Sequence, residues 1–118
     1  MKVINLAEKF VLIGEHWSPR IVEQVNNMVV KLAKLKGEFV WHHHDLEDEL
    51  FMVIKGCLTI RLADGELTLH EGELAVIPHG VEHCPVAAEE VQVLLLEPAS
   101  TVNTGTLIND RTVDAGWI

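Results

Sequence analysis

The chain has 118 residues and a mass of 13.2 kDa, with 48% hydrophobic and 23% charged residues, a composition typical of a globular domain and not of a disordered chain. Nine basic residues against eighteen acidic ones give a formal net charge of −9, which disfavours nucleic acid and anionic membrane surfaces as partners. No stretch approaches the roughly 20 apolar residues of a membrane-spanning helix. Polar residues interrupt the N-terminus, so we expect no secretory signal.

The predicted secondary structure is almost entirely β. One short helical turn is expected over residues 5–10, with Asn5 as its N-cap. Beyond it, short apolar or alternating runs are separated by turn residues, and Asp64-Gly65 suits a tight hairpin. The expected strands cover residues 21–25, 28–35, 39–44, 50–54, 58–62, 67–69, 74–77 and 91–96. Short strands at this spacing predict a sandwich or barrel. The tail, residues 99–118, is expected to pack on the barrel or on a partner chain.

Histidine is the unusual residue, with seven copies unevenly placed. In an extended strand, side chains at alternate positions share a face, so His42 and His44 are expected to point the same way and His43 the opposite way. Val40 leads the face of His42 and is apolar, which indicates that this face is interior. A run of histidines can also be a solvated loop, so the run alone does not decide between a functional site and a surface segment.

Glu49 follows a short acidic loop and is expected on the neighbouring strand. Its face continues with Phe51 and Val53, which we expect as apolar pocket walls. Buried imidazoles and a buried carboxylate without partners are costly, and a divalent cation would satisfy them. This donor set suits Fe, Mn, Ni, Cu, Co or Zn, and the lack of thiolate argues against a structural zinc site of the cysteine type.

Two stretches of the chain resemble the two motifs of the cupin superfamily. The first motif, G-x5-H-x-H-x3–4-E-x6-G, is matched by His42, His44, Glu49 and Gly56, with Gly37 one residue closer than usual. The second motif, G-x5-P-x-G-x2-H-x3-N, is matched by Gly72, Pro78, Gly80 and His83, with Ala87 in place of the final Asn. The resemblance covers about residues 37–100 and is closest to the small single-domain cupins of the mannose-6-phosphate isomerase-like group.

The resemblance implies a double-stranded β-helix, which is a jelly-roll barrel, preceded by the short N-terminal helical turn. It implies one cupin domain over residues 1–118, with the barrel core at about 37–100 and terminal arms at 1–20 and 99–118. It also implies a divalent metal held by His42, His44, Glu49 and His83. Related proteins are often cytoplasmic homodimers, and the two cysteines of this chain suit a reducing compartment.

Fold does not fix function, so three functions remain open. The first is a metal-dependent enzyme acting on a small organic molecule, as a dioxygenase or a Lewis-acid isomerase. The second is a metal-bearing protein that binds a sugar or an effector without turnover, and the third is a barrel with a vestigial site. His79, in the turn between Pro78 and Gly80, is a candidate pocket residue at the barrel mouth, although a solvated turn histidine would look the same.

Overall fold

The computed structural model describes residues 1–118 and contains one short helix and seven strands. In chain order the elements are α1 (Leu6–Val11), β1 (Arg20–Val25), β2 (Met28–Glu38), β3 (Glu49–Lys55), β4 (Leu58–Leu62), β5 (Gly65–Leu69), β6 (Leu74–Ile77) and β7 (His83–Pro98). The expected all-β barrel with one short N-terminal helix is confirmed. No helix is long and apolar enough to cross a membrane.

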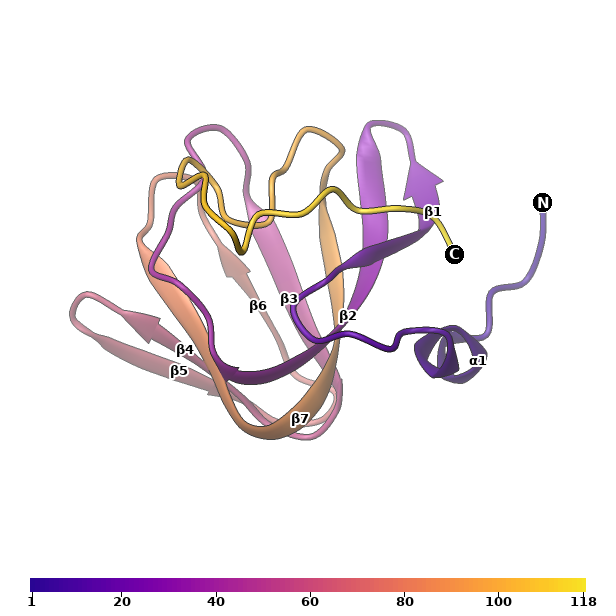
Figure 1. Cartoon of the computed structure of the whole chain (residues 1–118), viewed down its shortest axis with the longest axis horizontal. Helices are drawn as coiled ribbons and strands as arrows, with labels where there is room; N and C mark the ends of the chain where they lie inside the picture. The colour runs from indigo at the N-terminus through magenta and orange to yellow at the C-terminus, as the bar shows by residue number, and fades with distance from the viewer.

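Strand β7 organises the sheet because it pairs with three other strands. The main path runs β1-β2-β7-β3-β6, all antiparallel, and β4 pairs with both β5 and the first residues of β7. Leu95 therefore lies opposite Lys31 of β2 on one side and Phe51 of β3 on the other. Figure 1 shows the strands curving around an interior, with the β4–β5 hairpin at one side. A 16-residue strand that bends in this way joins both halves of the barrel.

The interior is filled by alternate residues of six strands, as the period-2 pattern predicts. Twelve buried apolar side chains form this main cluster: Ala33, Leu35, Phe51, Val53, Leu58, Ile60, Leu69, Ile77, Ala87, Val91, Val93 and Leu95. Phe51 of this cluster lies edge-on to His83, with the ring centres 6.3 Å apart. The site described below therefore has an apolar wall.

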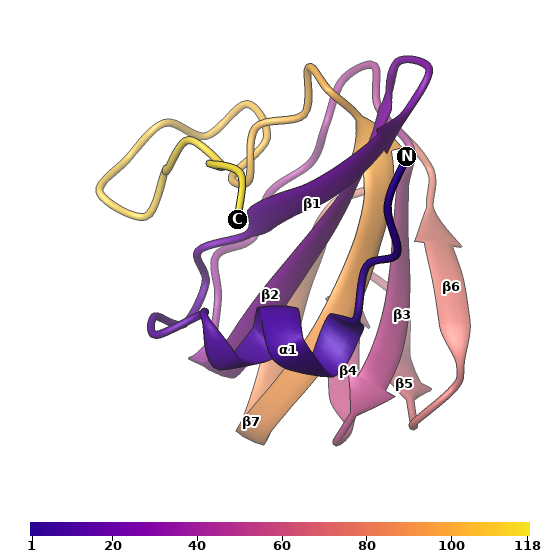
Figure 2. The ribbon, with the colours of Figure 1, turned by 90° about the vertical axis from the view of Figure 1, so that its right-hand side faces the viewer.

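A smaller apolar cluster lies on the outer face of the sheet, under α1. The Asn5 side chain accepts a hydrogen bond from the Glu8 N–H at 3.0 Å, which is the predicted N-cap. Phe10 of α1 packs with Ile13 against Val22 and Leu32 of β1 and β2. Figure 2 shows α1 in front of β2 while β6 stays uncovered. Part of the outer sheet face is thus left without an internal partner.

Two strand predictions were wrong in their extent. Residues 39–44 do not form a regular strand, because a bulge after Leu35 and the positive φ of Gly37 (83°) turn the chain out of β2. Only His42 keeps a strand-like pairing, with His83. The last strand begins at His83 and not near Val91. Pro85 obscures this start in the sequence, because proline usually interrupts a strand.

The C-terminal tail packs on its own barrel, one of the two expected arrangements. The Ile21 N–H donates to the Gly116 carbonyl at 2.8 Å, and the Ile118 N–H donates to the Ile21 carbonyl at 3.0 Å. Thr101 and Thr104 are buried. Figure 1 shows the tail crossing the same end of the barrel to which the loop between β2 and β3 rises. The tail therefore helps to shape the barrel mouth.

Candidate metal centre

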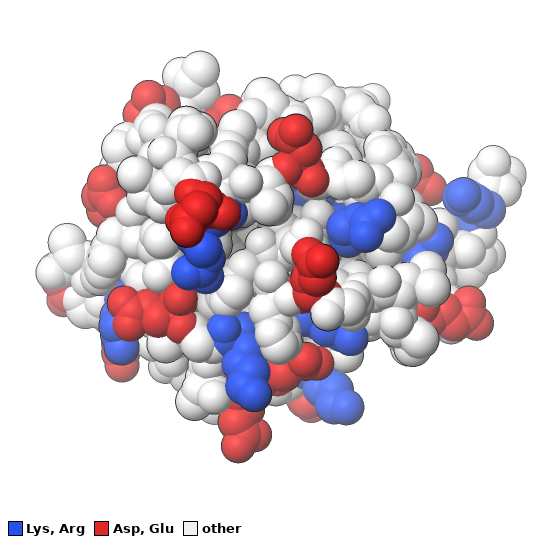
Figure 3. Space-filling model, in the orientation of Figure 1, with Lys and Arg blue, Asp and Glu red and all other residues white.

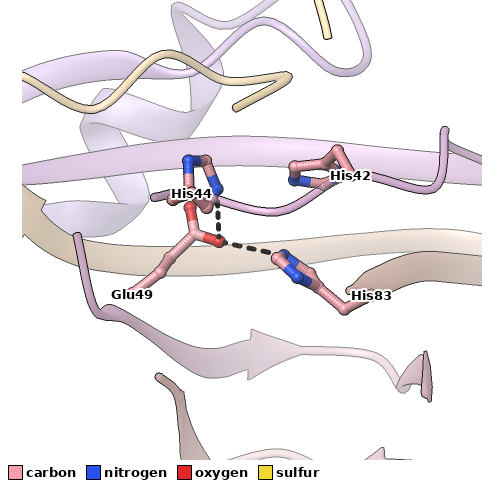
Figure 4. Close-up of side chains that lie close together, drawn as sticks. All are labelled: His42, His44, Glu49 and His83. Atoms are coloured by element: carbon pink, nitrogen blue, oxygen red, sulfur yellow. Dashed lines mark ion pairs between the residues drawn. The ribbon is translucent and has the colours of Figure 1, made fainter. Parts of the chain in front are cut away.

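Three separate segments bring four side chains together at the barrel mouth. His42 and His44 lie in the loop between β2 and β3, Glu49 opens β3, and His83 opens β7. The backbones of His42 and His83 exchange two hydrogen bonds, at 3.0 and 2.9 Å. This bridge fixes the irregular loop against β7 at the residues whose side chains converge (Figure 4).

The four side chains form a compact group of potential metal ligands. Their donor atoms lie within 4.8 Å of one another, and all four residues are buried. Oε1 of Glu49 is 3.5 Å from Nε2 of both His44 and His83. Two ligands that are each about 2.1 Å from one ion lie at most about 4.2 Å apart. Small side-chain rotations therefore suffice to bring all four donors to one divalent ion.

Backbone carbonyls orient two of the imidazoles. Nδ1 of His42 lies 2.9 Å from the Val40 carbonyl, and Nδ1 of His83 lies 2.9 Å from the Val81 carbonyl. A carbonyl only accepts, so these Nδ1 atoms carry the hydrogen and each Nε2 is left with a free lone pair. Such support is typical of metal-binding histidines, because it fixes both the tautomer and the ring orientation.

Several buried polar atoms of this group have no hydrogen-bond partner in the protein. They are both ring nitrogens of His44, Nε2 of His83 and Oε1 of Glu49. Burying such atoms unsatisfied costs about 1–3 kcal/mol each. A divalent cation would accept the free lone pairs and neutralise the carboxylate, so the residues present fit a transition metal such as Fe, Mn, Ni, Co, Cu or Zn.

The surroundings favour neutral imidazole at His42 and a charged carboxylate at Glu49. Burial, reinforced by His83, lowers the pKa of His42 to about 4. Burial raises the pKa of Glu49, but the neighbouring Glu97, His44 and His83 side chains outweigh burial and hold that pKa well below its ordinary value. Both groups are therefore in the protonation state that metal binding requires.

A buried ion pair adjoins the centre and was missed by the sequence analysis. Nζ of Lys31 lies 2.8 Å from Oε1 of Glu97, and both side chains are almost fully buried. Burial and the negative charge of Glu49 raise the pKa of Glu97 well above its ordinary value. Lys31 is therefore the cation that accompanies two neighbouring interior carboxyl groups, those of Glu97 and Glu49.

The strand pattern contained the signal for this pair. Lys31 stands between Val29 and Ala33 on the inward face of β2, and Glu97 continues the inward series of Val93 and Leu95 on β7. A charged residue at an inward position of an apolar alternation is unusual and needs a partner. The two positions are far apart in sequence, so their pairing emerges only from the register of β2 with β7.

A small cavity of about 40 Å³ opens onto the ligands. Its lining residues are Trp17, Pro19, Ala33, Leu35, Phe39, His42, Glu49, Phe51, Pro85, Leu95, Glu97 and Asn103. Phe51 is one of them, whereas Val53 is fully buried in the main cluster and His79 lies outside the cavity. Space of this size holds a few water molecules and no sugar. A larger molecule must leave part of itself at the rim.

The remaining histidines of the region lie at the surface. His79 is exposed, and its Nδ1 lies 2.8 Å from Asp48. His43 points away from the centre, as expected, and contacts Glu82 at 2.8 Å and Asp45 at 3.0 Å. These two imidazoles pair with surface carboxylates, and neither belongs to the buried group of potential metal ligands.

Comparison with known proteins agrees with this fold. Residues 28–97 match the family model described as a cupin domain. The chain therefore belongs to the cupin family, as the two motifs predicted. Its donor cluster occupies the positions that carried the resemblance.

Individual relatives are similar in sequence and structure. The solved cupin-2 domain protein of Shewanella frigidimarina is 49% identical, with a TM-score of 0.80 over 81% of this chain and 94% of that one. Protein NMB1881 of Neisseria meningitidis is 33% identical, with a TM-score of 0.76 over 82% and 99% of the two chains.

Among curated proteins, the uncharacterized protein YdbB of Bacillus subtilis is 41% identical over 63 residues, which are 52% of this chain and 56% of that protein. The match thus spans little more than half of the length of YdbB. These relatives support the family and the fold, and their names carry no activity.

Proposed function

We propose that this cupin is a metal-dependent enzyme that acts on a small organic molecule. The observation that carries the proposal is the set of buried, unpartnered lone pairs on His44, Glu49 and His83, beside the carbonyl-oriented His42. Evolution rarely keeps such atoms unsatisfied unless a ligand completes them. The adjoining cavity, which His42 and Glu49 help to line, gives a small molecule access to the cluster.

The side chains at this centre have different roles. A bound divalent metal supplies Lewis acidity and, if it is Fe(II), a site for O₂. The three imidazoles and Glu49 hold it, while Phe51 and Leu95 keep the inner wall apolar. Lys31 pairs with Glu97, whose side chain lies beside Glu49 at the wall of the same cavity.

A dioxygenase or a Lewis-acid isomerase fits this arrangement best. An ion held by these four side chains would still have room to bind water or adjacent oxygens of a substrate. The chemistry of the donor set, with three imidazoles and one carboxylate, suits both reaction types and does not choose between them.

Metal loading followed by product analysis tests the proposal. The purified chain is stripped of metal and reloaded with Fe(II), Mn(II), Ni(II) or Zn(II) without oxygen. Oxygen uptake and isomer formation are then followed over a panel of diols, catechols and 2-oxo acids. We expect turnover with at least one metal, and its loss in His83→Ala. Tight metal binding without turnover of any compound would contradict the proposal that this protein is an enzyme.

A metal-bearing binding protein that does not turn over its ligand is the second candidate. The pre-formed cavity with its mostly apolar lining beside the cluster favours it, because such a cavity can bind a ligand without any reaction. A rise in the melting temperature with a ligand that is recovered unchanged would support this reading.

We also propose that the protein is a cytoplasmic homodimer that binds neither nucleic acid nor membranes. The net charge of −9 supports the last two points, and on the face drawn in Figure 3 basic and acidic side chains alternate without a continuous basic area. Free thiols at Cys57 and Cys84 fit a reducing compartment.

The uncovered outer face of the sheet supports a dimer. Register places Val76, Leu50 and Leu96 side by side in a row across β6, β3 and β7, and none of the three carries a charge. Leu74 and Val76 of the edge strand β6 are 55% and 50% exposed. Such a self-complementary apolar face suits a second copy related by a twofold axis.

A further inference from the structure

Arg111 lies at the rim of the cavity, and the ring of Phe39 packs between it and His42, one of the candidate metal ligands. Its guanidinium carbon is 5.0 Å from the ring centre of Phe39 and 5.9 Å from that of Trp17. The two rings stack with their centres 4.7 Å apart, and both line the cavity. On its other side Phe39 packs edge-on against His42 at 5.4 Å. The cation is therefore held beside the approach to the metal centre.

The side chain of Arg111 has no polar partner in the protein. The other two arginines are engaged: Arg20 donates to the carbonyls of Gly116 and Trp117, and Arg61 pairs with Glu38 at 3.4 Å. No carboxylate lies within 4.0 Å of Arg111, and none of its side-chain N–H groups donates a hydrogen bond. Its fork of donors is free for a ligand.

The tail forms a closed loop that holds this arginine in place. Nδ2 of Asn103 donates to the Arg111 carbonyl at 2.9 Å, and Oδ1 of Asn109 accepts from the Arg111 N–H at 2.9 Å. The hydroxyls of Thr104 and Thr112 are 2.6 Å apart across the loop. A free cation on a well-tied loop is pre-organised for binding.

The same loop is attached to the metal centre. The Thr106 N–H donates to the His43 carbonyl at 3.1 Å. Gly105 packs so closely on that carbonyl that a Cβ there would overlap it. The position of Arg111 is thereby tied to the segment that carries His42 and His44.

We propose that Arg111 determines specificity, and that the ligand of this centre is a small organic acid whose distal carboxylate binds the guanidinium of Arg111. The oxygens at the other end of the acid reach the ion held by the four ligands, so the inference rests on the proposed metal centre. A guanidinium and a carboxylate form paired hydrogen bonds, which favours this anion over a neutral group. The cavity is too small to enclose such an acid, which leaves its distal end at the rim where Arg111 lies.

Calorimetry with matched probes tests the inference without requiring turnover. The chain is loaded with Ni(II) and its metal content is measured. It is then titrated with malonate, succinate and glutarate, and with the corresponding monoamides, in which the distal carboxylate is neutral. We expect at least one dicarboxylate to bind ten times more tightly than its monoamide, and the best chain length to report the span from the ion to Arg111.

Variants assign the preference to this residue. Arg111→Met is expected to lower the affinity for the best dicarboxylate at least tenfold and to remove its advantage over the monoamide. Arg111→Lys should retain part of the advantage, and Arg61→Met, which lies outside the site, should retain all of it. Acetate binding, which needs only the ion, should be equal in all four proteins.

The outcomes separate the two proposals. A protein that takes up no Ni(II) overturns the metal centre and this inference with it. A protein that takes up Ni(II) but binds dicarboxylates and monoamides equally overturns the inference alone, and this comparison needs no variant. Equal dicarboxylate affinity in Arg111→Met and the wild type also overturns it.

Discussion

His42 and His83, which are 41 positions apart in the chain, exchange both backbone hydrogen bonds across the barrel mouth, at 3.0 and 2.9 Å. Their rings lie 4.3 Å apart. Each ring is oriented by a carbonyl two residues earlier in its own chain segment, Val40 for one and Val81 for the other. The two motif histidines therefore share the same local geometry, and the hydrogen bond of each Nδ1 to a backbone carbonyl leaves its Nε2 free to bind a metal.

Removing one ligand should abolish tight metal binding. His83→Ala and His42→Ala each delete one imidazole from a four-donor set, and we expect metal content after dialysis to fall at least tenfold. Elemental analysis of the purified variants measures this. His79→Ala is the matched control, because this imidazole is exposed and pairs only with Asp48. Retention of metal by both ligand variants would show that the cluster is not the binding site.

The metal-free protein should lose stability as the pH falls from about 6.5 towards 4. His42 has an ordinary pKa of 6.5 and a folded-state pKa of about 4. Above pH 6.5 His42 is neutral in both the folded and the unfolded chain, so it causes no loss of stability there. Below pH 6.5 the unfolded chain binds a proton at His42, whereas the folded chain does not until the pH approaches 4. The free energy of unfolding therefore declines by roughly 3 kcal/mol over this range.

Urea denaturation at a series of pH values measures this decline. The His42→Phe variant is the control, because it lacks the titrating group, and its decline should be shallower by the contribution of His42. Bound metal should shift the wild-type decline to lower pH, since the ion competes with protons for Nε2. Equal slopes in the wild type and in His42→Phe would contradict the prediction.

Breaking the buried pair of Lys31 and Glu97 should be costly. Lys31→Met leaves the two interior carboxyl groups without a cation, and we expect a loss of about 3 kcal/mol in the free energy of unfolding. The double variant Lys31→Met with Glu97→Leu removes both partners and should recover most of this loss. Denaturation of the single and double variants forms the cycle, and additive losses would refute the coupling.

Gly105 should tolerate no side chain. Its φ is +61°, and a Cβ would overlap the His43 carbonyl, so Gly105→Ala should cost about 2 kcal/mol and loosen the tail. Gly116→Ala is the matched control in the same tail, where the nearest neighbour is the Arg20 side chain at 3.6 Å. The hydrogen-exchange rate of the Thr106 amide should rise in Gly105→Ala and not in Gly116→Ala. An unchanged exchange rate in Gly105→Ala would contradict the prediction.

The outer sheet face should mediate dimer formation. Val76→Lys places a charge in the apolar row on β6, and we expect light scattering to shift from the dimer mass to the monomer mass. Leu67→Lys is the control, because this partly exposed residue lies on β5 away from the row. A wild-type protein that scatters as a monomer would remove the dimer proposal.

Much of the molecule could be predicted from local pattern. The Asn5 cap, the presence of a tight hairpin after residue 62 and strand β6 at residues 74–77 follow from capping, turn chemistry and alternation, which act over a few residues. The hairpin turn itself lies one residue earlier than predicted, at Ala63-Asp64, because Gly65 already pairs with Leu62 as the first residue of β5. The spacing of the two motifs pointed to His42, His44, Glu49 and His83, and the structure brings these side chains together. Such signals survive in the sequence because each depends on near neighbours.

Other features were decided only by tertiary packing. The segment 39–44 is an irregular loop held by His83, although its residues alternate like a strand. Lys31 meets Glu97 because β2 and β7 pair in one particular register. Arg111 reaches the cavity rim because the tail folds back over the loop that carries the histidines. Alternation tells which way a side chain faces, whereas the partner it meets depends on how distant segments pack, and that is fixed only when the whole barrel closes.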